Sequence, residues 1–306
     1  MIRGDGALSA FLVNDAICLV MAPIVGGVTR ALRRDPLPYL VATATASNCG
    51  SVATITGNPQ NMVIGALSGI SYPAFSAALA PVAAFGLVLV VVVVRLVYRE
   101  EFARRVALDP HFVRHRSHPG QMLKASLTCG ALAIAFFAGV RPAEAAIIGG
   151  AFLLLTRALK PARIYRELDG PLQILFAGPF VVVAGAERAL LTPEVVASVQ
   201  SFGLADPWRL SALVAVLSNI VSNVPAALAL KPFIPPLADA HRAWLVVAMS
   251  STLAGNFTLI GSVANLIVAE QARAAGSPIS FFAYFKVGLP LTLVTLAFGT
   301  VWLAWT

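Results

Sequence analysis

The stretch Ser47-Asn-Cys-Gly-Ser-Val-Ala-Thr-Ile-Thr-Gly-Asn-Pro-Gln-Asn61 decides the fold of this chain. It combines glycine, hydroxyl and amide side chains with a proline, and it holds no charge. The flanking segments, residues 39–46 and 62–67, are apolar enough to lie in a membrane. Because lipid cannot hydrogen-bond backbone groups, irregular backbone at that depth must be buried in protein or line a watery cavity. A polar break in an apolar helix is typical of the ion or substrate sites of secondary transporters.

The composition indicates an all-α polytopic membrane protein whose partner is the lipid bilayer. Of the 306 residues, 58% are hydrophobic and only 12% are charged, whereas a soluble chain carries about 25% charged residues. Residues 75–94 contain no charge, and this run is long enough to cross a bilayer core of ~30 Å as a helix. Comparable runs lie at about 121–139, 143–156, 171–186, 207–230, 243–269 and 281–305.

The net charge of +8 comes from basic residues that gather on one side of the expected topology. Cytoplasmic loops carry an excess of Lys and Arg, which makes this side cytoplasmic. We therefore expect a multi-pass protein of a bacterial inner membrane and no nucleic-acid partner. The assignment places on that side all of the 22 Lys and Arg residues except Arg141, Arg188, Arg209, Lys231 and Arg242.

Nothing in the sequence indicates an enzyme or a cofactor. The three cysteines follow no disulfide or metal pattern. His111, His115 and His118 lie in a basic loop with a spacing that matches no compact zinc motif. No nucleophile–base set appears either, so we expect no catalytic residues and no metal beyond a Na⁺ that the transport site could hold.

Taken in order, the chain predicts two hairpins and two broken helices. Residues 7–13 and 16–29 form the arms of a first re-entrant hairpin, with Asn14-Asp15 at its tip capping the second arm. Residues 48–58 break the first broken helix, between half-helices at 38–47 and 59–67. The second hairpin turns at 218–225, and the second broken helix runs from 244 to 275 with its break at 255–261. A last span covers 281–305.

An internal repeat relates these elements. Residues 14–23 match residues 223–232, with Asn and Pro nine positions apart in both. Residues 54–61 match 258–265, sharing Thr, Gly and Asn at the same spacing, and Pro81 matches Pro290. The first hairpin opens to the cytoplasm and the second to the outside, so the predicted repeats have inverted topology. Two inverted repeats whose broken helices meet at the midplane are a transporter plan.

The two copies are unequal in length. We expect a partial first repeat at 1–98, a basic cytoplasmic loop at 99–120 and a second repeat at 121–306. Three spans precede the hairpin of the second copy, and almost nothing precedes that of the first. The sequence therefore predicts an incomplete first repeat in a chain truncated at its N-terminus.

Four motifs carry a resemblance to a known family. The chain resembles the arsenite permease and NhaD-type branch of the ion transporter superfamily, the citrate-transporter-like proteins. The motifs are Phe11-Leu-Val-Asn-Asp-Ala-Ile-Cys-Leu19, Ser47-Asn-Cys-Gly-Ser-Val-Ala-Thr-Ile-Thr-Gly-Asn-Pro-Gln-Asn-Met-Val-Ile-Gly65, Ser218-Asn-Ile-Val-Ser-Asn-Val-Pro225 and Leu253-Ala-Gly-Asn-Phe-Thr-Leu-Ile-Gly-Ser-Val-Ala-Asn-Leu-Ile-Val268. The resemblance implies an inverted-repeat fold with a scaffold domain and a moving transport domain.

The resemblance also extends to sodium-coupled dicarboxylate carriers, whose hairpin tips carry Ser-Asn-Thr. Here the tips read Val13-Asn14-Asp15 and Ser222-Asn223-Val224. An acid at a membrane-buried tip is costly and is a functional residue by default, so we expect Asp15 to take a proton or sodium as the site loads. A plain helix cap in water is the alternative for Asp15, and packing or capping is the alternative for the other polar residues of the site.

We therefore expect secondary active transport of a small inorganic or organic ion, such as an arsenite-like oxyanion or a carboxylate, coupled to H⁺ or Na⁺. A truncated, non-transporting fragment and an Na⁺/H⁺ antiporter are the alternatives, and a homodimer is a further expectation. The expected substrate- and ion-binding residues are Asn14, Asp15, Ser47, Asn48, Thr54, Gly57, Asn58, Asn61, Ser222, Asn223, Thr258, Gly261, Ser262 and Asn265.

Overall fold

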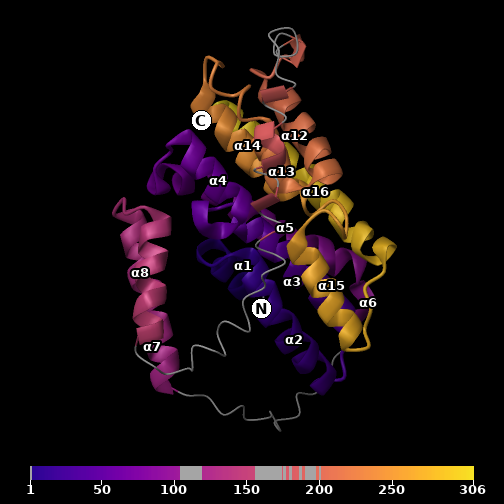
Figure 1. Ribbon diagram of the computed structural model, residues 1–306. Coiled ribbons are helices and arrows are strands. Elements are labelled where there is room, and N and C mark those ends of the chain that lie inside the picture. Colours follow the sequence, from indigo (N-terminus) through magenta and orange to yellow (C-terminus); the bar gives the residue numbers. More distant parts are fainter. Residues whose placement is uncertain are drawn as a thin grey trace.

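The computed structural model describes residues 2–103, 119–155 and 201–306, with short pieces at 174, 177–178, 181–185, 188–189 and 198–199 (Figure 1). Every element in these ranges is a helix, as the composition predicts. The first half holds α1 (Ile2–Phe11), α2 (Asn14–Ala31), α3 (Pro36–Ser51), η1 (Ile55–Gly57), α4 (Pro59–Ser68), α5 (Tyr72–Val97) and α6 (Arg99–Ala103). The second half holds α7 (Pro119–Phe137), α8 (Pro142–Leu155), α12 (Pro207–Val221), α13 (Asn223–Ala229), α14 (Ala240–Ala254), α15 (Val263–Ala274) and α16 (Phe281–Trp305).

Three of these helices, α5, α7 and α16, are long and apolar enough to cross a membrane. They correspond to the spans expected at 75–97, 121–139 and 281–305. The shorter apolar helices α8 and α12 correspond to the runs at 143–156 and the start of 207–230. Half of the expected span at 171–186 and most of the basic loop at 99–120 lie outside the described residues.

Polar caps set where many of the helices begin. An Asp, Asn or Ser side chain accepts a hydrogen bond from a backbone N–H of the first turn and satisfies one of its free donors. Pro in the first turn follows several of these caps, because its missing N–H is not needed there. The capping residues are Asp35 before α3, Asn58 before α4, Ser71 before α5, Asp206 before α12, Asp239 before α14 and Ser280 before α16.

The main body interleaves the two halves of the chain. Helix α3 packs against α1, α2 and α5, and α2 also packs against α15 from the far end of the sequence. Helices α5 and α16 pack together through the stacked rings of Phe85 and Phe298 and through a hydrogen bond from Trp302 Nε1 to the Ala78 carbonyl. Figure 1 shows α7 and α8 as a pair beside this body. The contacts between segments distant in sequence bring both helix breaks into the centre of the body.

The first break is shorter than the sequence predicts. Helix α3 continues through Ser47 and Asn48 and ends at Ser51, so the expected break at 48–58 begins too early. The helix tolerates these polar residues because their side chains find buried partners. Ser51 Oγ donates back to the Asn48 carbonyl at 2.9 Å, and Asn48 bonds across the core, as described below. The second break falls between α14 and α15, at the predicted residues 255–261.

The first hairpin arm also differs from its prediction. Helix α1 begins at Ile2 rather than at residue 7 and includes Asp5 and Gly6. The predicted Asx cap at the tip is wrong, because Asn14 is the first residue of α2 and Val13 occupies the cap position without a side-chain bond. The amide of Asn14 is instead used in a contact with α3.

Candidate functional site

The centre of the body is a buried network of amides and hydroxyls, with Asn48 at its hub. The Asn48 side chain accepts from Asn14 Nδ2 at 3.0 Å and from Ser262 Oγ at 3.2 Å. It donates to Asn256 Oδ1 at 2.9 Å and to Asn265 Oδ1 at 3.0 Å. Both lone pairs and both amide protons of Asn48 are therefore used. Three of the four partners come from the opposite half of the sequence and the fourth comes from the first hairpin tip, so this residue joins the hairpin to the second break.

The contacts between the two halves are reciprocal. Residues 48, 58 and 61 correspond to residues 252, 262 and 265, at a constant separation along the chain. Asn48 bonds Ser262 and Asn265, as given above. In the mirror arrangement, Thr252 Oγ1 accepts from Asn58 Nδ2 at 3.1 Å and donates to Asn61 Oδ1 at 3.4 Å. Asn48 and its equivalent Thr252 therefore play the same part. Each bonds two residues of the other half: the one just before the helix that follows the break, and the asparagine three positions later.

Each break is held by one asparagine that clamps two carbonyls. Asn61 Nδ2 donates to the carbonyls of Ser51 and Thr54 at 3.1 and 3.0 Å. Its counterpart Asn265 donates to the carbonyls of Gly255 and Thr258 at 2.7 and 3.1 Å. These side chains satisfy backbone acceptors that the ended helices leave free. A helix can therefore be interrupted here without exposing its carbonyls to lipid.

The first tip is tied to the network through α3. Ser47 Oγ donates to the Asn14 carbonyl at 3.2 Å and shares a hydrogen bond with Ser9 Oγ at 2.8 Å. Asp15 lies beside Asn14 in the first turn of α2 and is only 7% exposed. Among the described residues its carboxylate makes no hydrogen bond or ion pair. The structure therefore places an unpaired acid next to the hub.

The second tip is looser. Ser222 is exposed and joins α12 to α13 with φ 78° and ψ 160°, a region that side chains rarely occupy. Asn223 is buried, yet its Oδ1 has no hydrogen-bond partner, and the same holds for Asn219 Oδ1 and Ser218 Oγ. Asn219 Nδ2 donates to the Ala254 carbonyl at 3.1 Å, at the end of α14. This tip thus presents unused oxygens to the second break.

Four predicted site residues act through the backbone of the breaks or lie at their edges. Thr54 is buried and donates to the Ala10 carbonyl, and Gly57 lies in η1, packed so closely on Ser51 that a β-carbon would overlap its backbone. Thr258 is half-buried and contributes its carbonyl to the Asn265 clamp. Gly261 is buried, and a β-carbon there would meet Asn219 Oδ1 at 3.0 Å.

The structure therefore connects one part of the predicted set and leaves another part unconnected. Side-chain hydrogen bonds join seven predicted residues in one network, in which Ser51 Oγ links Asn58 to the Asn48 carbonyl. The seven are Asn14, Ser47, Asn48, Asn58, Asn61, Ser262 and Asn265. Asp15, Ser222 and Asn223 lie at the tips without such a bond among the described residues.

Sequence reasoning missed three members of this region: Thr252, Asn256 and Asp5. The repeat could have indicated Thr252, since it occupies the position of Asn48. Asn256 corresponds to Val52, so the repeat gave no signal there. Asp5 is fully buried in α1, where its carboxylate accepts from Thr43 Oγ1 at 3.1 Å. The only signal for Asp5 was the acid itself, and it was overlooked because the first hairpin arm was expected to begin at residue 7 rather than at Ile2.

The network can bind an ion by neutral oxygens and amides rather than by formal charge. Within the described part of the chain, no group of three His, Cys, Asp or Glu side chains could hold a metal ion. Amide and hydroxyl oxygens are ligands for hard cations, and N–H groups and helix N-termini bind anions. The hub, cap and clamp residues are almost fully buried. The network is therefore closed to solvent in this structure.

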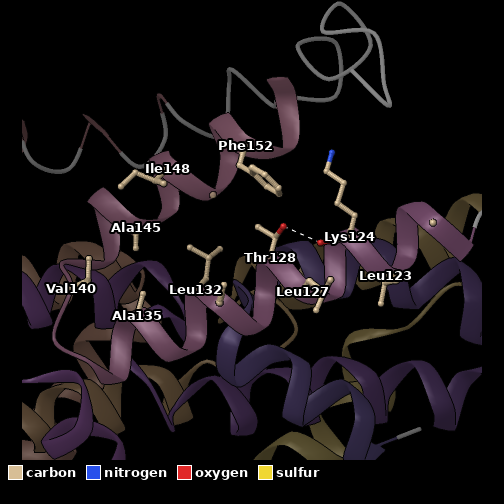
Figure 2. A pocket seen from close by; sticks show the side chains of 13 residues that line it. Leu123, Lys124, Leu127, Thr128, Leu132, Ala135, Val140, Ala145, Ile148 and Phe152 are labelled. Carbon is tan, nitrogen blue, oxygen red and sulfur yellow. Dashed lines mark hydrogen bonds between the residues drawn. The ribbon is translucent and has the colours of Figure 1, made fainter. Parts of the chain in front are cut away.

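A separate hollow of about 660 Å³ lies between α7 and α8, away from this network (Figure 2). Its lining is apolar apart from Thr128 and Lys124, and Figure 2 shows Leu132, Ile148 and Phe152 facing it from the two helices. Many of the side chains of α7 and α8 are exposed. Such a surface suits contact with hydrocarbon rather than the binding of a hydrated ion.

Comparisons with known proteins agree with this architecture. The model of the citrate transporter family matches residues 3–254 and 207–305. An uncharacterized transporter of Mycobacterium bovis is 27% identical over 321 residues, which cover 96% of this chain and 73% of that protein. A silicon efflux transporter of Oryza sativa subsp. japonica is 27% identical over 365 residues, covering 95% and 75%. A Dictyostelium discoideum protein named as transporter arsB is 34% identical over 173 residues, covering 54% and 31%.

The family match spans nearly the whole chain and includes both breaks and both tips. It agrees with the resemblance carried by the four motifs, with the apolar helices and with the all-helical structure. This chain is a membrane protein and belongs to the citrate transporter family.

Proposed function

We propose that the protein is a secondary active transporter of a small ion, and that the cargo binds where the two helix breaks and the two hairpin tips meet. The observation that carries this proposal is the reciprocal network in which each half holds the break of the other. A buried polar interface between two broken helices has no use in a passive scaffold, but it suits a site that opens to alternate sides of a membrane.

Inverted repeats and re-entrant hairpins are part of the proposal. The constant separation between residues 48, 58, 61 and residues 252, 262, 265 supports a two-fold relation between the halves. The same clamp at Asn61 and Asn265 supports equivalent backbone paths. The chain would then span a bacterial inner membrane several times, with its basic residues in the cytoplasm.

The cargo and the coupling ion would use different groups. The first turns of α2 and α13 offer free N–H groups and the positive ends of their helix dipoles. These groups favour an anion or a neutral molecule that carries hydroxyl groups. The unused oxygens of Asn14, Asn219 and Asn223 suit a Na⁺. Asp15, unpaired and buried, suits a proton or Na⁺.

Flux in proteoliposomes against a panel of ions tests the proposal. The panel contains citrate, arsenite, silicic acid, sulfate, phosphate and sodium, each with and without a pH gradient and a Na⁺ gradient. Uptake of one cargo that depends on either gradient would support secondary active transport. Absence of uptake for every member, by a protein that is folded and inserted, would contradict it.

Asp15→Asn tests the coupling role. The amide keeps the shape of the side chain but cannot take a proton or neutralise Na⁺, so we expect gradient-driven flux to be lost while insertion is unchanged. Asp35→Asn is the matched control, because Asp35 is an exposed helix cap and Asn caps a helix about as well as Asp. Undiminished coupled flux in Asp15→Asn would remove the residue from the mechanism.

Na⁺/H⁺ antiport is a second candidate, favoured by the oxygen-rich lining and the unpaired acid. In that case Na⁺ is the cargo rather than the coupling ion. Sodium efflux driven by a pH gradient without any anion in the panel would select this candidate over the first.

A further inference from the structure

Asp5 is a second buried acid on the first hairpin arm, outside the predicted site. It is fully buried, and its Oδ1 has no hydrogen-bond partner. The carboxyl group receives one side-chain hydrogen bond, from Thr43 Oγ1 to Oδ2 at 3.1 Å. Among the described ion pairs none includes Asp5. An ionised carboxylate so poorly satisfied in a dry interior is strongly disfavoured, so the group must be neutral or paired with a cation.

The hydrogen bond to Thr43 can exist in two forms without movement of either side chain. The Thr43 hydroxyl has one proton, but it lies within hydrogen-bond distance of two acceptors, Asp5 Oδ2 and the Tyr39 carbonyl at 3.0 Å. If Thr43 donates to Tyr39, its oxygen can only accept, and Asp5 must then be the donor. That donor exists only when Asp5 carries a proton. The pair can therefore hold Asp5 in either its protonated or its ionised form.

Asp5 lies in the contact between α1 and α3, called here the α1–α3 seam. This seam excludes water and leads to the proposed transport site. Gly50 on α3 lies so close to Gly6 on α1 that a β-carbon would overlap its backbone. One turn beyond Asp5, Ser9 Oγ lies 2.7 Å from the backbone carbonyl of Asp5, to which it can donate. The same hydroxyl lies 2.8 Å from Ser47 Oγ, and either of the two hydroxyls can be the donor in that bond. Ser47 in turn bonds the carbonyl of Asn14 at the tip. Movement of the tip would therefore disturb the α1–α3 seam that keeps Asp5 dry.

In the described part of the chain no ion pair joins Asp5 to a basic side chain, and the N-terminal amino group acts on it through space. Helix α1 packs against α2, α3, α5 and η1. Cys18 on α2 lies within electrostatic range of both Asp5 and Asp15. The titratable or charged groups on these elements are Asp15, Cys18 and Arg30 on α2, Tyr39 and Cys49 on α3, and Tyr72 and Arg95 on α5, with none on η1. Both basic residues lie in the last turns of their helices, whereas Asp5 bonds Thr43 in the interior of α3.

We propose that Asp5 is a second proton-binding residue of the transporter, protonated when the α1–α3 seam is closed and ionised when movement of the first hairpin admits water. This inference rests on the proposed transport function. It adds a second coupled proton, bound by Asp5 rather than by Asp15. It makes the arm of the hairpin, as well as its tip, part of the coupling machinery.

Two measurements on the purified full chain test the proposal. Infrared spectroscopy in detergent reports the C=O stretch of a protonated carboxyl, and the parent protein at neutral pH should show a component of this band that is missing in Asp5→Asn and present in Asp15→Asn. Thr43→Val should keep the band and shift it to higher wavenumber, because the carboxyl loses its hydrogen bond. Asp35→Asn, which changes an exposed acid, should leave the band unchanged.

In proteoliposomes, each coupled proton raises the cargo accumulation ratio about tenfold per pH unit. Asp5→Asn should therefore lower that ratio about tenfold per unit of pH gradient while exchange of cargo for cargo continues. An absent carboxyl band, or an Asp5→Asn spectrum identical to that of the parent protein in this region, overturns the proposal. So does an unchanged accumulation ratio. If the parent protein transports nothing, the proposed function fails separately, and the infrared result still decides whether Asp5 holds a proton.

Discussion

The two helix breaks share a backbone clamp but differ in the side chains around it. Asn61 and Asn265 make equivalent pairs of hydrogen bonds. At the position that crosses to the other half, however, the first break has Asn48 and the second has Thr252. An amide has two donors and two acceptor sites, whereas a hydroxyl has one donor. The two breaks are therefore alike in how their backbone carbonyls are held. They differ at the crossing position, where the first half has the greater capacity for side-chain hydrogen bonds.

The tips differ in the same direction. The first tip has two acids nearby, Asp5 and Asp15, and its Asn14 is bonded to the hub. The second tip has no acid at the matching positions, which are Val214 and Val224, and among the described residues no side-chain hydrogen bond ties its Asn223 to Thr252, whereas Asn14 Nδ2 bonds the hub. In the proposed transporter, the acids available to a proton or Na⁺ at these positions therefore lie in the first half.

Asn48→Ala should have the largest effect on this comparison. It leaves four buried partners unsatisfied, and at ~1 kcal/mol for each lost hydrogen bond the loss of stability should be about 4 kcal/mol. Thr252→Ala removes three such bonds, to Asn58, Gln60 and Asn61, and should cost about 3 kcal/mol by the same reasoning. Unfolding in detergent as a function of denaturant measures both. Equal losses would show that the two positions carry equal weight, contrary to the asymmetry described above.

The glycines of the two breaks should differ next. A β-carbon at Gly57 would overlap the Ser51 backbone, whereas one at Gly261 would meet its nearest neighbours at 3.0 Å. We expect Gly57→Ala to cost about 3 kcal/mol and Gly261→Ala about 1 kcal/mol, the range for overpacked cores. Thermal unfolding of the two variants measures the difference. The reverse order would mean that the second break is the more rigid one.

Ser222 and Val13 provide the smallest test, at the turns of the two hairpins. Ser222 has φ 78°, which glycine adopts without strain, whereas Val13 has an ordinary φ of −52°. Ser222→Gly should therefore stabilise the protein by about 1 kcal/mol, and Val13→Gly should destabilise it by about 0.5 kcal/mol. Thermal unfolding of both variants checks the signs. A destabilising Ser222→Gly would indicate that the serine side chain has a role in the folded protein.

The sequence predicted the features that depend on composition and repetition. Apolar runs gave the long helices, and Gly-Asn-Phe-Thr at 255–258 gave the second break, because glycine and polar residues between apolar segments leave few other structures in a membrane. The first break was displaced because Ser47 and Asn48 look like loop residues until their buried partners are known. Asn256 and Asp5 were missed because their matching positions are Val52 and Val214. Long-range partners, rather than local pattern, decide those sites.

The bridge between the halves consists of amides and hydroxyls and carries no formal charge. A membrane potential does work only on net charge, about 2.3 kcal/mol per elementary charge for each 100 mV. Breaking and reforming this bridge is therefore insensitive to voltage. In the proposed transporter, voltage dependence then comes from the cargo, the coupling ions and the charge states of Asp5 and Asp15, and not from the bridge.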